Sequence, residues 1–143
     1  MGMIHELADD PGDRTPSELH ERYLSALVAA IDDHGVKSVA EVSGVDPARL
    51  RTLLDGDDPD VTLEEAASIL AVSEESPDGE TIAMIARDEL LMGMTTAVLD
   101  VEAVESGIDG ELEAREIQSK IEGRFPMTLR EFALLHQYIS GAR

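Results

Sequence analysis

A signature for the start of an α-helix recurs along this chain, and it limits the folds that the chain can adopt. The stretches 15–18, 38–41, 62–65 and 128–131 each begin with Ser or Thr and carry Glu three residues later. In this capping box the hydroxyl accepts from the backbone N–H three residues on, and the carboxylate accepts from the N–H of the first residue. Because this exchange fits only the first turn of a helix, four helices are predicted to begin there.

A fifth start is predicted at Asp46 and Pro47, since Asp caps helices and proline fits their first turn. Gly35, Gly44 and Gly56 follow helical segments and predict their ends. Behind the caps, apolar residues recur at helical spacing, at Leu24, Leu27, Val28 and Ile31, at Leu50, Leu53 and Leu54, and at Leu63, Ala66, Ala67 and Leu70. No segment alternates apolar and polar residues like a strand. We therefore expect an all-α protein of about seven to eight helices.

Two parts of the chain are similar to each other. Residues 43–46 read SGVD and 106–109 read SGID, while 62–67 read TLEEAA and 128–133 read TLREFA. We interpret the match as a degenerate internal repeat, with chance similarity as the alternative because such turns and helix starts are common. The predicted division is an N-terminal arm over 1–14, a helix-turn-helix-like domain over 15–76 and a C-terminal helical domain over 77–143.

The first unit resembles the Cro and phage-repressor (lambda-repressor-like) type of helix-turn-helix. The resemblance rests on SVAEVSGVDPARLRTLLDG at 38–56 and TLEEAASILAVS at 62–73. It implies that the helix over 46–54 lies in the major groove of double-stranded DNA. Since Leu50, Leu53 and Leu54 are expected to face inward, the side chains left to contact DNA are Ala48, Arg49, Arg51 and Thr52.

The charge around this helix opposes DNA binding in dilute salt. The chain has 31 acidic and 11 basic side chains and a formal net charge of -20. Asp46 stands at the start of the expected reading helix, and Asp55 and Asp57 follow its end. Phosphate binding normally depends on several Lys or Arg contacts, which are scarce here.

The acidity is spread evenly between apolar residues, and lysine is nearly absent. Such a composition resembles that of cytoplasmic proteins from salt-loving archaea, where multimolar salt shrinks the Debye length to about 3 Å. The chain is also similar to a family of uncharacterised halophilic-archaeal proteins through PMTLREFALLH, ELLMGMTTAVLDV and HELADDPG. The absence of cysteine and of a membrane-length apolar run favours a cytoplasmic protein and no membrane partner.

A methionine-rich segment over 81–101 is expected to be a helix with apolar residues on two sides. Ile82, Ile85, Met92 and Leu99 line one side, and Met84, Leu91 and Val98 recur every seven residues on another. One interpretation is a spine buried between the two units. The other is an exposed face that binds a partner or forms a homodimer, as a two-fold DNA reader needs.

Nothing in the sequence indicates an enzyme, a cofactor or a small-molecule substrate. The four histidines, His5, His20, His34 and His136, have no metal-ligand spacing and are expected at the surface or at helix ends. No nucleophile–base pair or glycine-rich phosphate loop occurs. The leading hypothesis is a DNA-associated, transcription-regulator-like protein that contacts DNA through Arg49, Arg51 and Thr52. The alternative is an interaction or dimerisation module that keeps the helix-turn-helix shape without binding DNA.

Overall fold

The computed structural model describes residues 4, 10–73 and 76–142 of the chain, and within these ranges the fold is built from helices. A short 3-10 helix, η2 (Pro11–Asp13), comes before eight α-helices: α1 (Pro16–His34), α2 (Val36–Ser43), α3 (Pro47–Leu54), α4 (Leu63–Leu70), α5 (Gly79–Ala97), α6 (Val101–Gly107), α7 (Ala114–Ile121) and α8 (Leu129–Gly141). The expected all-α fold of seven to eight helices is confirmed.

Three of the four predicted capping boxes form as the sequence indicates. The hydroxyls of Thr15, Thr62 and Thr128 each accept from the backbone three residues on, and the paired Glu accepts from the Thr N–H. The prediction at Ser38 is wrong, because α2 begins at Val36 and Ser38 lies inside it. The reason is that Gly35, with a φ of 84°, ends α1 and caps α2 at once, so the second helix starts earlier.

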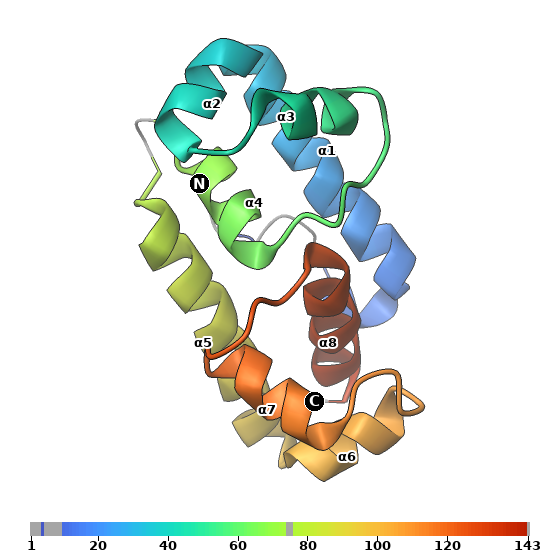
Figure 1. The fold of residues 1–143 in the computed structure, drawn as a ribbon. Helices are drawn as coiled ribbons and strands as arrows, with labels where there is room; N and C mark the ends of the chain where they lie inside the picture. The colour runs from blue at the N-terminus through green and yellow to red at the C-terminus, as the bar shows by residue number, and fades with distance from the viewer. Residues whose placement is uncertain (1–3, 5–9, 74–75, 143) are drawn as a thin grey trace.

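The helices fall into two sets of four that correspond in order, although α8 has 13 residues where α4 has 8. Helices α1 and α5 both have 19 residues, and each precedes two short helices and then a helix with a Thr capping box. In Figure 1, α2 and α3 lie at one end and α6 and α7 at the other, with α1 and α5 along opposite sides. The arrangement has the appearance of a pseudo-two-fold axis between the two sets.

The two sets meet where α4 and α8 begin. The Leu63 N–H donates to the Met127 carbonyl and the Leu129 N–H donates to the Val61 carbonyl, each at 2.7 Å. This reciprocal exchange forms an isolated antiparallel bridge between Thr62 and Thr128. The capping residues that the sequence comparison paired are therefore neighbours in space.

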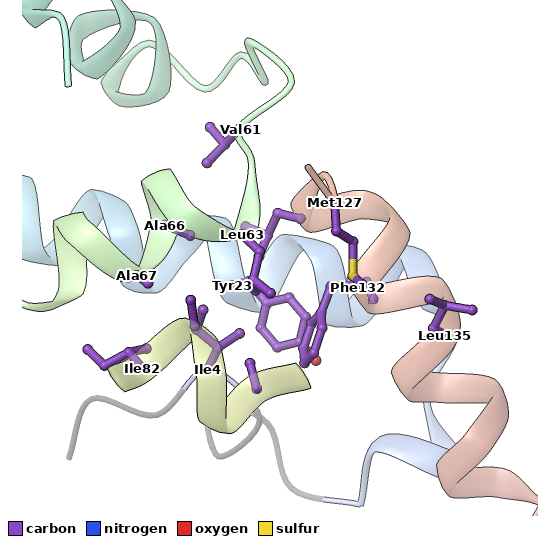
Figure 2. Close-up of a cluster of buried hydrophobic side chains, with 14 of the residues drawn as sticks. Ile4, Tyr23, Val61, Leu63, Ala66, Ala67, Ile82, Met127, Phe132 and Leu135 are labelled. Carbon is purple, nitrogen blue, oxygen red and sulfur yellow. The ribbon is translucent and has the colours of Figure 1, made fainter. Parts of the chain in front are cut away.

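The long helix of each set packs against the last helix of the other set, so the two sets share one hydrophobic core. Helix α1 packs on α8, and α5 packs reciprocally on α4. At the centre the rings of Tyr23 and Phe132 lie 5.7 Å apart, and Figure 2 shows them beside Leu63 and Met127. Ile4, from the expected N-terminal arm, is 1% exposed and belongs to the same core. The proposed domain boundaries stay predictions from the sequence.

Candidate interaction surface

Helix α3 begins as expected, but its arginines have different surroundings. Asp46 caps the helix by accepting from the Ala48 N–H at 2.8 Å. Arg49 donates to both carboxylate oxygens of Glu65 in α4, at 2.8 and 2.9 Å. Its guanidinium is therefore held in a bidentate pair between α3 and α4, the strong form of this interaction.

The remaining predicted DNA contacts lie on the outer side of α3. Ala48 and Arg51 are exposed, and the Thr52 hydroxyl donates to the Ala48 carbonyl at 2.9 Å. The structure thus keeps Arg51 available to solvent but engages Arg49. Sequence reasoning missed the pairing of Arg49 because its partner Glu65 already serves as the capping-box residue of α4.

Helix α5 carries the largest group of exposed apolar side chains in the described part of the chain. Met84, Leu91, Met92 and Val98 are 54%, 52%, 65% and 89% exposed. The other side of the helix is buried through Ile82, Ala83, Ala86, Leu90, Gly93 and Met94. The sequence also predicted an apolar side formed by Ile82, Ile85, Met92 and Leu99. Of these residues Ile82 is buried, Ile85 and Leu99 are partly buried and Met92 is exposed. The exposed polar residues Asp88 and Thr95 lie among the exposed apolar ones on the helix. Exposed apolar side chains gathered on one element in this way mark interaction sites in soluble proteins.

Helix α1 gives an internal comparison for this surface. It has the same length as α5 and buries residues at the same positions, for example Leu27 where α5 has Leu90. At the positions of the exposed Met84, Leu91 and Met92, α1 has Glu21, Val28 and Ala29. Since both helices pack in the same way, the fold itself does not require methionine at these outer positions.

Val98 is the clearest exception to the local rules of helix ends. It caps α5 with φ 57° and ψ 50°, the left-handed region that disfavours β-branched side chains. The equivalent residue after α1 is Gly35, and the other described non-glycine residues with positive φ are Asp10, Asp60 and Asp109. Val98 thus combines backbone strain with nearly full exposure of its side chain. The left-handed turn lets the Val98 N–H donate to the Thr95 carbonyl at 3.2 Å and the Leu99 N–H donate to the Met94 carbonyl at 2.8 Å. Glycine would form the same turn without the strain, so the turn does not require valine.

A groove of about 670 Å³ runs beside the exposed face of α5, between α4, α5 and the end of α7. Met84 and Leu91 form part of its lining. Within it Arg87 is fixed, since its Nη2 donates to Glu64 and its Nε donates to the Lys120 carbonyl at 3.1 Å. Arg87 therefore ties α5 to both α4 and α7 and holds the walls of the groove in place.

The expectation of surface histidines is wrong for His20, which is 6% exposed. Its Nε2 lies 3.1 Å from Oδ2 of Asp58, a close polar contact without the alignment of a hydrogen bond. The same carboxylate oxygen accepts from Arg130 at 3.0 Å. Burial lowers the pKa of His20, and the nearby Asp58 carboxylate opposes that shift. This cluster joins α1, the loop before α4, and α8.

The expectation is also wrong for His136, which is 3% exposed in α8. Its Nδ1 and the hydroxyl of Tyr23 form a buried hydrogen bond of 2.9 Å, and burial raises the pKa of Tyr23. His34 is exposed at the end of α1, as expected, and His5 lies outside the described residues.

No group of three His, Cys, Asp or Glu side chains within the described ranges is placed to hold a metal ion. No helix in those ranges is long and apolar enough to cross a bilayer.

Comparison with known proteins identifies the family of this chain. The model of a family of unknown function, DUF5791, matches residues 19–142. The match covers most of the chain, including all eight α-helices except the start of α1. No match was found among the curated proteins or among the solved structures. The chain belongs to the DUF5791 family.

Proposed function

We propose that this DUF5791 protein is a non-enzymatic protein-interaction module whose binding surface is the exposed apolar face of α5. This face is defined by Met84, Leu91, Met92 and Val98. The observation that carries the proposal is Val98, a strained and nearly fully exposed valine at a position where the equivalent helix ends in Gly35. When a partner buries the Val98 side chain, the free energy of that burial offsets the cost of the strained backbone.

The energetics of the α5 face support the same proposal. Burying a Met, Leu or Val side chain contributes about 1.5–3 kcal/mol relative to leaving it in water. Met84 and Leu91 are 54% and 52% exposed in the isolated chain and Val98 is 89% exposed, so a partner that covers them gains roughly half of this energy at the first two and most of it at Val98. Methionine also adapts its shape to a partner surface, because its side chain is unbranched and polarisable.

The proposal is tested by quantitative affinity purification of a tagged chain from its native cells. Wild type is compared with Met84→Ser/Leu91→Ser and with Val42→Ser, a control that replaces a valine 66% exposed on α2. Proteins retained by wild type and Val42→Ser but lost from the double variant are the expected result. Identical sets of retained proteins from all three chains would reject the α5 face as the binding surface.

A second candidate function is sequence-specific binding of double-stranded DNA through α3. The specific observation in its favour is the α2–turn–α3 geometry, in which Gly44 adopts φ 76° and Arg51 is exposed. The net charge of -20 and the engagement of Arg49 by Glu65 weigh against it. Discrete genomic sites that are recovered by crosslinking and lost on Arg51→Glu, but not on Arg22→Glu in α1, would support this function.

Arg51→Glu is a cleaner test than changing Arg49. Reversing the charge of Arg49 would place two carboxylates at the α3–α4 contact and disturb the fold.

The proposal includes a cytoplasmic location in a salt-loving archaeon, supported by 31 acidic side chains and no cysteine.

A further inference from the structure

The groove beside α5 has an apolar lining and a charged rim. Ala83, Met84, Leu91 and Ile121 supply the apolar lining. The rim carries exposed carboxylates, and the two that make no ion pair within the described residues are Glu80 and Asp88. Of the four carboxylates that line the groove, Glu64 is paired with Arg87 and Glu122 with Arg124, so the unpaired charge of the rim comes from Glu80 and Asp88.

Two small residues let α4 and α5 approach closely at one end of the groove. Gly79 lies against Ser68, and a Cβ added at Gly79 would lie 3.1 Å from the Ser68 Cα. In the other half of the molecule the equivalent hollow is lined by Pro16, His20 and Leu134, and its volume is about 400 Å³. The two halves share a fold, but the hollow beside α5 is the more open one.

The spacing of the exposed residues fits a helix as the occupant. Met84, Leu91 and Val98 recur every seven residues, the period at which one helix packs along another. From Met84 to Val98 the face extends about 21 Å at the helical rise of 1.5 Å per residue. A partner helix of about four turns would cover it.

We infer that the groove between α4, α5 and α7 binds an amphipathic helix of a partner protein that has apolar side chains on one face and Lys or Arg along its edges. The inference rests on the proposed function and specifies its partner. Apolar side chains of the partner would cover Met84 and Leu91, and its cationic groups would face Glu80 and Asp88. This is the helix-in-groove mode of recognition, with charge complementarity to select the partner.

A second copy of the chain is a poor occupant on electrostatic grounds. A symmetric α5–α5 contact would bring Glu80 and Asp88 of both copies to one interface, where enclosed charges are screened by salt less than exposed ones are. Like charges brought together in this way oppose association. A cationic helix meets no such repulsion.

The test uses a defined probe, an 18-residue synthetic peptide with Leu at i, i+3, i+4 and i+7 and Lys elsewhere. Its affinity for the full chain is measured by fluorescence anisotropy and compared with that of a scrambled peptide of the same composition. Glu80→Gln/Asp88→Asn is expected to weaken binding about ten-fold. The matched control Asp32→Asn/Asp33→Asn changes the net charge equally at the far end of α1 and should change the affinity less than two-fold.

The apolar part of the inference is tested with Met84→Ser/Leu91→Ser, which is expected to weaken peptide binding about 100-fold. Equal effects of the groove and control charge variants would overturn the inference. Equally tight binding of a Leu and Gln peptide of the same pattern, lost on Met84→Ser/Leu91→Ser, would reject a cationic partner but leave the α5 face as an interaction surface. Equilibrium sedimentation showing a dimer that Leu91→Ser dissolves would identify a second copy as the occupant and overturn the inference.

Discussion

Replacing Val98 with glycine is expected to stabilise the isolated protein, although valine to glycine changes usually destabilise. Val98 holds φ 57° and ψ 50° after the last turn of α5. For a residue with a Cβ the left-handed conformation costs about 1–2 kcal/mol, and glycine adopts it without this cost. The side chain is 89% exposed, so its removal loses little burial energy.

The opposing contribution comes from the unfolded chain. Glycine gives the unfolded state more conformational freedom, which lowers the free energy of unfolding by about 0.4–1 kcal/mol. The relief of strain exceeds this cost, so Val98→Gly should raise the free energy of unfolding by about 0.5–1 kcal/mol. For a chain of this size that corresponds to a rise in Tm of about 2–4 °C.

The assay is urea and thermal unfolding followed by far-UV circular dichroism, with Val42→Gly as the matched control. Val42 is 66% exposed within α2, where glycine should destabilise by about 0.5 kcal/mol because the backbone is helical. Opposite signs for the two substitutions are expected. A decrease in stability for Val98→Gly equal to that for Val42→Gly would refute the argument from strain, and with it the observation that carries the proposed function.

Three further predictions concern the rest of the fold. Burial lowers the pKa of His20, so the folded chain binds a proton there less readily than the unfolded chain does. As pH falls below the ordinary pKa of 6.5, the unfolded state is protonated first and the free energy of unfolding should drop. His20→Gln should remove part of this drop in urea titrations between pH 8 and 5, and an unchanged profile would contradict the assignment. Thr62→Ala and Thr128→Ala should each cost about 1 kcal/mol in urea unfolding, because each removes a helix cap beside the central bridge; costs near zero would show that these caps are dispensable. The Tm should rise between 0.1 and 2 M KCl, because salt screens the net charge of -20, and a constant Tm would oppose adaptation to salt.

The parts of the fold that depend on neighbouring residues were predictable from the sequence. Thr62 and Thr128 cap their helices through partners three residues away, so the signal lies within one stretch of the chain. Ser38 has the same signal but does not cap a helix, because Gly35 turns the chain in a single residue and α2 already begins at Val36. A capping pattern alone does not reveal such competition from the preceding turn.

The contacts between distant residues were not predictable in this way. The partner of His136 is Tyr23, 113 positions away, and nothing in the local sequence pairs them. Arg49 satisfies the pattern of an exposed recognition helix, yet Glu65 binds it once α3 and α4 pack. The seven-residue recurrence through Leu91 did indicate an apolar face, but only the packing of α5 decided that this face is exposed.

The strain at Val98 and the acidic groove point to the same side of α5 from independent observations. Val98 is a side chain whose backbone conformation costs stability in the isolated chain. Glu80 and Asp88 indicate which partner chemistry the same helix would select. The stability of the isolated chain and its ability to bind are therefore expected to change in opposite directions on Val98→Gly.

The measurement that tests the proposed α5 surface most directly is site-specific photo-crosslinking in living native cells. A benzophenone amino acid is placed at Leu91 in one chain and at Val42 in another, since both side chains are exposed on helices. A discrete crosslinked protein is expected from Leu91, lost when Met84 is changed to Ser, and none is expected from Val42. Equal crosslinking from both positions, or none from Leu91, would contradict the claim that α5 is the surface through which this protein acts.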